Sequence, residues 1–170
     1  AHLDGQVGRA LERSLRSQGL DLRTETRLAA AAPEGGGLRL TFEGGKAEDL
    51  RCDRLLVAVG RRPLTGALGL EEARVALDPK TGRIRVDARY RTTAPGVYAI
   101  GDLVDGPMLA HKASAEGAAA AEEMAALPGE VNYDAIPSAV YTAPEVGSVG
   151  LTEDDLKARS VAYRSGAVPF

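Results

Sequence analysis

The sequence comprises 170 residues with a formal net charge of −3, of which 44% are hydrophobic and 26% charged. This balance excludes a disordered chain, the apolar runs are too short for a membrane helix, and the net charge provides no electrostatic reason to expect nucleic-acid binding. Cys52 is the only cysteine, which excludes an internal disulfide and is typical of a reducing compartment, so we expect a cytoplasmic location.

The first predicted element is an amphipathic helix from Asp4 to Gln18, with apolar residues at helical spacing, an N-capping aspartate and Gly19 just beyond its end. Residues 20–28 alternate apolar and polar side chains, which predicts a half-buried strand. A second alternating strand is expected over residues 38–42, after a P-E-G-G-G turn and before a turn at Gly44–Gly45. Together these strands predict a small antiparallel meander.

Residues 54–59 are apolar enough to predict a central, parallel strand that ends at Gly60. Gly60 has two interpretations: a tight turn, or a position without a Cβ where the backbone can approach a bound ligand. The following Arg61 and Arg62 are expected to be structural. Residues 64–91 are rich in turn signals and predict a connector that contains a domain boundary.

The most informative stretch begins with Val97–Ile100, a short apolar run that predicts a strand buried on both faces. Gly101–Asp102 ends this strand, so the carboxylate is expected in the crevice where open α/β sheets hold their ligands. A short acid there suits a ribose or ribityl hydroxyl. The alanine-rich residues 108–124 predict a helix whose amino end faces the same crevice and favours a partner with negative charge.

Beyond this helix, a Leu-Pro-Gly stop precedes two short predicted strands over residues 138–142 and 146–149. A helix is expected from Thr152, because its first residues resemble a capping box with acidic side chains near the positive end of the helix. Residues 163–170 are predicted to begin another strand.

The motif G-V-Y-A-I-G-D followed by G-P-M-L-A-H-K-A-x-x-E-G resembles the second flavin-binding motif of the pyridine nucleotide-disulfide oxidoreductases. Its M-L-A-H-K-A form is most similar to the dihydrolipoamide dehydrogenase branch of that family. L-L-V-A-V-G-R-R-P, I-P-S-A-V-Y-T-A-P-E-V and S-V-G-L-T-E agree in order, so the resemblance covers essentially the whole chain.

The resemblance implies an α/β fold built from parts of two Rossmann-like dinucleotide-binding domains and the start of an α+β interface domain. Residues 1–69 correspond to the later half of an NAD-binding domain and residues 70–130 to the second part of an FAD-binding domain. Residues 131–170 correspond to the start of the dimerisation domain.

The implied activity is oxidation of protein-bound dihydrolipoamide with NAD, through FAD and a redox disulfide. The implied partners are a second copy of the chain and the acyltransferase component of a 2-oxo-acid dehydrogenase complex. The family's redox cysteine pair, dinucleotide fingerprints and His-Pro acid/base segment are absent from this sequence. We therefore expect an internal portion of a longer chain, inactive by itself, and assign no catalytic or metal-binding residue. The alternatives are another FAD/NAD(P) disulfide reductase, such as glutathione or mercuric reductase, and a non-catalytic fragment.

The resemblance also implies a set of cofactor-binding residues. A carboxylate would accept a hydrogen bond from a flavin ribityl hydroxyl, first-turn backbone N–H groups would donate to the flavin pyrimidine, and two other backbone positions would contact NAD. The predicted set is Asp102, Met108, Leu109, Ala110 and His111 for FAD, with Gly60 and Leu28 for NAD.

Three positions in the motif have structural interpretations. A lone histidine at a helix start is typically a hydrogen-bonded structural group, so His111 is not assigned as an acid or base. The simplest interpretation of Glu116–Gly117 is ordinary surface and close packing, and a glycine within a helix suggests that another backbone or the cofactor approaches Gly117 closely.

Overall fold

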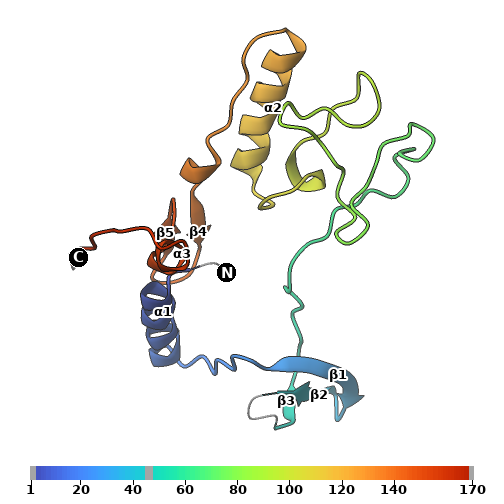
Figure 1. The fold of residues 1–170 in the computed structure, drawn as a ribbon. Coiled ribbons are helices and arrows are strands. Elements are labelled where there is room, and N and C mark those ends of the chain that lie inside the picture. The colour runs from blue at the N-terminus through green and yellow to red at the C-terminus, as the bar shows by residue number, and fades with distance from the viewer. Residues whose placement is uncertain (1–2, 45–47, 169–170) are drawn as a thin grey trace. The chain divides into compact units, whose positions relative to one another are not determined.

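The structure, a computed structural model, describes residues 3–44 and 48–168. His2, Gly45 of the predicted turn and the last two residues of the predicted strand 163–170 lie outside the described residues. The chain divides into two compact units, one formed by Ala1–Val59 with Ser138–Phe170 and the other by Gly60–Pro137. The elements, coloured in chain order in Figure 1, are α1 (Gly5–Ser17), β1 (Arg27–Glu34), β2 (Gly37–Glu43), β3 (Leu50–Cys52), η1 (Gly101–Leu103), α2 (Ala110–Met124), η2 (Tyr133–Ala135), β4 (Ser138–Val140), β5 (Val146–Ser148) and α3 (Glu153–Ala158).

Helix α1 confirms the first prediction. Asp4 is its N-cap and accepts a hydrogen bond from the backbone N–H of Gln6 at 2.8 Å. Its second carboxylate oxygen accepts from the N–H of Glu153, at 3.1 Å, and the N–H of Gly5 donates to Asp154 at 3.3 Å. The carboxylates of Asp4 and Asp154 therefore satisfy backbone groups at the amino ends of both α1 and α3.

Strands β1 and β2 form an antiparallel hairpin closed by Gly35 and Gly36, whose φ angles are 59° and 86°. Positive φ at both turn residues matches the right-handed twist of the strands, and glycine adopts it without strain. Because this turn sets the register, β2 pairs with the residues just before it. The predicted strand over residues 20–28 is therefore wrong up to residue 26, and β1 runs on through residues that the sequence assigned to the approach to the turn.

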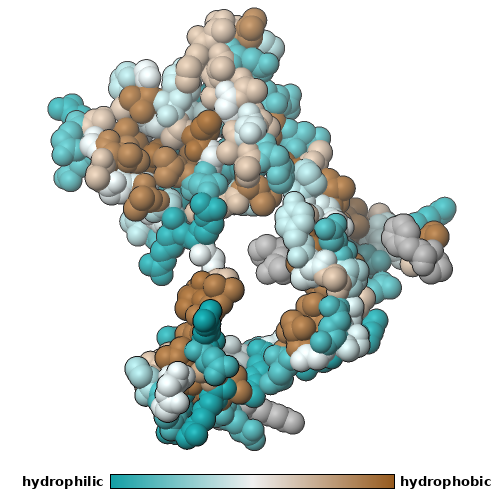
Figure 2. Space-filling model, turned by 180° about the vertical axis from the view of Figure 1, so that it is seen from behind, coloured by the Kyte–Doolittle hydropathy of each residue, from teal (hydrophilic) through white to brown (hydrophobic). Residues whose placement is uncertain are grey.

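Strand β3 pairs with β2 and completes the expected antiparallel meander. Leu40, in the central strand, is its buried apolar residue. The predicted strand over 54–59 is wrong: this stretch is extended without ladder partners, and Leu56 and Val59 are 89% and 93% exposed. A central strand needs neighbours on both sides, and the described residues supply none here. Figure 2 shows exposed hydrophobic residues as brown patches on the surface.

The unit from Gly60 to Pro137 is built from loops packed around α2 rather than from a sheet. Its larger core cluster consists of small and branched apolar side chains, namely Val75, Ile84, Ala94, Ala99 and Val104. The predicted buried strand over residues 97–100 is wrong as a strand, because its described pairing is a single bridge from Tyr98 to Arg91. Its burial is observed in part, since Ala99 is 7% exposed but Val97 is 39% exposed.

Helix α2 confirms the predicted helix but begins two residues later, at Ala110, because Leu109 is extended with φ −126° and ψ 132°. The buried side chains Lys112, Glu116, Ala119 and Ala120 share one face of this helix. Gly129 packs so closely against the same face that a Cβ there would lie 2.1 Å from the Ala119 carbonyl oxygen.

Strands β4 and β5 and helix α3 lie in the unit that contains α1. Strands β4 and β5 pair antiparallel, and α3 begins with the predicted capping box between Thr152 and Asp155. The predicted strand beyond residue 162 is wrong over residues 163–168, which form no ladder. Across residues 3–44 and 48–168, no helix has the length and apolarity needed to cross a membrane.

Candidate functional site

Asp102 lies in the short helix η1, in the middle of the predicted flavin-binding motif. Its side chain is 38% exposed and its carboxylate lies 3.6 Å from the guanidinium of Arg61. An exposed ion pair of this length contributes little to stability. The carboxylate is therefore accessible to a ligand, with a cation nearby.

The preceding residue, Gly101, brings this carboxylate close to α2. Its φ of 72° is a backbone conformation that residues with a side chain adopt rarely. A Cβ at Gly101 would lie 3.2 Å from the Cβ of Ala113 in the first turns of α2. Both the backbone angle and the close approach require glycine at this position.

Two charged residues of α2, Lys112 and Glu116, hold the Gly101 backbone from both sides. They are the most buried large side chains of the described chain, 0% and 1% exposed, and their charged groups lie 2.9 Å apart. The Lys112 ammonium also donates to the carbonyl oxygens of Gly101 and Asp105, each at 3.1 Å. All three of its donor positions are therefore used.

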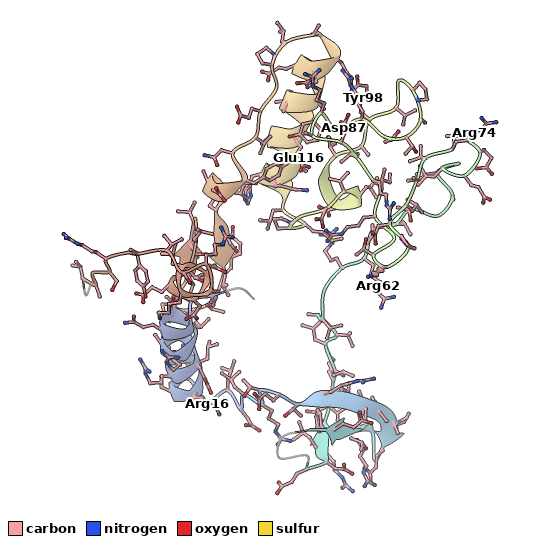
Figure 3. All side chains as sticks on the ribbon, viewed as in Figure 1. Arg16, Arg62, Arg74, Asp87, Tyr98 and Glu116 are labelled. Atoms are coloured by element: carbon pink, nitrogen blue, oxygen red, sulfur yellow. The ribbon has the colours of Figure 1, made fainter. Side chains whose placement is uncertain are left out.

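The Glu116 carboxylate completes the arrangement. One oxygen accepts a hydrogen bond from the Gly101 N–H at 2.7 Å, and the other accepts from the Tyr133 hydroxyl at 2.9 Å. Figure 3 shows Glu116 on α2, the helix in the same unit as the Gly101–Asp102 turn. Because both the N–H and the carbonyl of Gly101 are bound by side chains of one helix, Asp102 is held in place next to α2.

Tyr133 links this pair to the chain beyond α2. Its hydroxyl lies 3.3 Å from that of Tyr90, which is itself buried. Since the Tyr133 proton points at Glu116, the Tyr90 hydroxyl is the donor between the two phenols. Burial, followed by the hydrogen bonds to Tyr90 and Glu116, raises the pKa of Tyr133 well above its ordinary value, so the phenol is protonated at neutral pH.

The amino end of α2 has no side-chain cap. Its N-cap is Leu109, whose own N–H donates to the Pro107 carbonyl at 3.0 Å. The N–H groups of the next residues have no partner within the helix, as in the first turn of any α-helix. His111 Nε2 lies 2.8 Å from the Pro137 carbonyl oxygen, a contact expected of a structural histidine.

The structure therefore brings Asp102 and the stretch from Met108 to His111 to the same end of α2. Gly60 belongs to the same unit, with φ 121° and open space where a Cβ would be. Leu28 belongs to the other unit, in β1, where it pairs with Phe42 beside an irregularity in the register. The described residues hold no group of three His, Cys, Asp or Glu side chains that could bind a metal ion.

Sequence reasoning missed the most buried part of this site. The interpretation of Glu116 as ordinary surface is wrong, and neither Lys112 nor Tyr133 was assigned a role. A signal was available: Lys112 and Glu116 are four residues apart, on the same helical face as the small residues Ala119 and Ala120. Charged residues in line with a row of alanines indicate a close-packed face that contains an ion pair. Gly117 has a packing reason, since a Cβ there would lie 3.3 Å from Ile100.

Comparison with protein families supports the interpretation drawn from the motif. The model of the pyridine nucleotide-disulphide oxidoreductases matches residues 1–117, and the model of their dimerisation domain matches residues 136–170. The chain is 49% identical over 174 residues to the dihydrolipoyl dehydrogenase of Trypanosoma brucei brucei and 44% identical over 172 residues to the human mitochondrial enzyme. These alignments cover 99% of this chain but 36% and 34% of the two relatives, so the chain spans about a third of their length.

Solved structures agree. LpdA from Mycobacterium tuberculosis matches with a TM-score of 0.85 and 28% identity, over 95% of this chain and 35% of that one. The HOCl-induced flavoprotein disulfide reductase RclA from Escherichia coli matches with a TM-score of 0.80 and 25% identity, over 91% of this chain and 35% of that one. These neighbours confirm the predicted fold class. The chain belongs to the pyridine nucleotide-disulphide oxidoreductase family.

Proposed function

We propose that this chain is a portion of a dihydrolipoyl dehydrogenase, a flavoprotein that oxidises protein-bound dihydrolipoamide with NAD through FAD and a redox disulfide. The observation that carries the proposal is the Gly101–Asp102 turn, held against the amino end of α2 by Lys112 and Glu116. The names of its sequence relatives support the same activity. Since this sequence has a single cysteine, the disulfide would be formed by residues outside it.

The residues at the amino end of α2 fit the flavin. A bound FAD would supply the electron-transfer chemistry, and the residues of this chain would bind and orient it. The exposed carboxylate of Asp102 would accept a hydrogen bond from a ribityl hydroxyl. Of the backbone N–H groups from Met108 to His111, that of Leu109 donates to the Pro107 carbonyl. The others would donate to the flavin pyrimidine, where the positive end of the α2 dipole favours negative charge.

The NAD contacts are proposed at backbone positions. The missing side chain of Gly60, and the open space where its Cβ would be, allow a dinucleotide to approach the chain closely. The backbone near Leu28 would contact the adenine end. These assignments rest on the family pattern.

We also propose a homodimer, the acyltransferase component of a 2-oxo-acid dehydrogenase complex as partner, and the predicted domain division. Subunits would pair through the residues from about 131 onward, and the match of residues 136–170 to the dimerisation domain supports this. A cytoplasmic location stays a prediction, and several of the relatives are named as mitochondrial enzymes.

A second candidate function is reduction of another disulfide by a flavoprotein of the same fold. The likeness to a flavoprotein disulfide reductase of Escherichia coli favours it. The two candidates share the flavin site and differ in the substrate.

One assay on the full-length protein that carries this sequence distinguishes the two. We expect it to contain FAD and to reduce NAD in the presence of dihydrolipoamide. Oxidation of NADPH by glutathione disulfide, without activity on dihydrolipoamide, would support the second candidate. A protein that binds no flavin would contradict both.

A matched pair of variants tests the assignment of Asp102. Asp102→Ala removes the proposed acceptor, and we expect the FAD dissociation constant to rise about tenfold or more, as for loss of a hydrogen bond to a charged group. Asp105→Ala is the control, because its side chain is fully exposed and the Lys112 contact uses its backbone.

A further inference from the structure

The flavin-binding turn and the chain beyond α2 are connected by an unbroken line of hydrogen bonds within one unit. The line runs from the Tyr90 hydroxyl to the Tyr133 hydroxyl, to one oxygen of Glu116, and from its other oxygen to the Gly101 N–H. Asp102 is the next residue. Tyr133, which makes no proposed contact with the flavin, therefore donates to the carboxylate that holds the Gly101–Asp102 turn.

The position of Tyr133 is itself well defined. It is the first residue of η2, which is capped by the Asn132 side chain accepting from the N–H of Asp134 at 3.1 Å. The residue is 50% exposed, so its ring contributes less to packing than that of the buried Tyr90. The hydrogen bond from its hydroxyl to Glu116 is therefore a main interaction of the Tyr133 side chain.

The orientation of the Glu116 carboxylate depends on donors at both oxygens. Lys112 and Tyr133 bind one oxygen at 2.9 Å each, and this leaves the other directed at Gly101. Without the phenol, Lys112 is the remaining donor to the first oxygen, and the carboxylate can rotate about its terminal bond. Rotation would weaken the bond to the Gly101 N–H and release the turn that presents Asp102.

We propose that Tyr133 is a positioning residue for the flavin site, which acts through Glu116 to hold the Gly101–Asp102 turn against the amino end of α2. This inference rests on the proposed function, since it takes FAD as the ligand of Asp102. It concerns a residue that makes no proposed contact with the cofactor.

The test uses the full-length protein and Tyr133→Phe, which removes the hydroxyl and keeps the ring. We expect the FAD dissociation constant to rise about tenfold, as for loss of a hydrogen bond to a charged group, together with a shift in the absorption bands of the bound flavin. Tyr163→Phe is the matched control, because the Tyr163 hydroxyl also donates to a glutamate, Glu153, at 2.9 Å, but in the other unit. We expect that control to change neither quantity.

A second variant keeps the inference testable if Tyr133→Phe does not fold. Tyr90→Phe removes the hydroxyl at the start of the line, and we expect a rise of about two- to threefold in the FAD dissociation constant, as for a weaker hydrogen bond between neutral groups. Unchanged FAD binding and an unchanged flavin spectrum in the folded variants would overturn the inference alone. A wild-type protein that binds no FAD would overturn the proposed function, and the inference with it.

Discussion

Two apolar segments with the same sequence pattern have opposite surroundings in this molecule. Residues 54–59 and 97–100 are both short apolar runs closed by a glycine, and both are predicted as buried strands. Neither forms a ladder, yet the first is exposed, with Val59 at 93%, whereas the second is packed on two sides. Ala99, 7% exposed, lies in a core cluster of loop residues, and Ile100 packs against the core cluster that includes Ala119 and Ala120 of α2. The difference lies in the partners, because loop residues and a helix with small residues and a buried ion pair cover the second segment, and no described element covers the first.

The largest expected effect comes from breaking the buried pair that holds the second segment. Lys112→Ala leaves the Glu116 carboxylate buried without its cation, and we expect a loss of about 3–5 kcal/mol of stability in the full-length protein. This loss is measured by thermal unfolding, monitored by circular dichroism. Lys157→Ala is the matched control, since Lys157 is also four residues from its glutamate, Glu153, but lies on the surface. We expect a much smaller change there, and equal changes would contradict the assigned role of burial.

A substitution in each segment compares the two directly. Ile100→Ala should cost about 2 kcal/mol or more, because Ile100 packs against Gly117 on the helix. Leu56→Ala should change stability by about 0.5 kcal/mol or less, as for an exposed side chain. The shift of each variant's unfolding midpoint from that of the wild type compares the two losses of stability. A large loss for Leu56→Ala would show that this segment is buried in the full-length protein and would remove the contrast.

The closing glycines provide a further comparison. Gly101→Ala combines an unfavourable φ of 72° with a contact at 3.2 Å to Ala113, and we expect it to cost about 1–3 kcal/mol. Gly60→Ala also has a positive φ, but open space surrounds the site and the exposed segment can adjust. We therefore expect a smaller loss for Gly60→Ala in the same unfolding measurement, and the reverse order would contradict the close packing at Gly101.

Alkaline pH should lower the stability of the protein through Tyr133, and we expect this to be the smallest of the four effects predicted here. Burial raises the pKa of Tyr133 above its unfolded value, so its contribution to stability is complete below about pH 10 and is lost as the pH rises toward the folded pKa. The midpoint temperature of unfolding should therefore decrease as the pH is raised above about 10.

The Tyr133→Phe variant identifies the source of that fall, because it should show a shallower pH dependence than the wild type. Tyr163, whose pKa is also raised by burial and by Glu153, contributes in the same direction, so the double variant should be shallower still. A Tyr133→Phe protein with the full wild-type slope would exclude Tyr133 as a source.

Local signals in the sequence predicted the three α-helices and the glycine turn after β1, with α2 beginning two residues later than predicted. The capping residues Asp4 and Thr152, the paired glycines after β1 and the alanine-rich run of α2 act through neighbours a few residues away. The strands predicted over residues 20–26, 54–59, 97–100 and 163–168 are wrong, because a strand requires a partner that the alternation of side chains does not identify.

For the site, the motif alone placed Asp102 beside the amino end of α2, because the apolar run, the turn and the helix follow one another within a short stretch of chain. The sequence by itself thus determined the family, the helix and the turn that presents the carboxylate. Only the tertiary structure decided that Lys112 and Glu116 are buried around Gly101 and that Tyr133 reaches the same carboxylate from beyond the helix. The physical reason is that a charged residue is placed in the interior only where its complete set of hydrogen-bonding partners assembles, and those partners come together through folding rather than through sequence proximity.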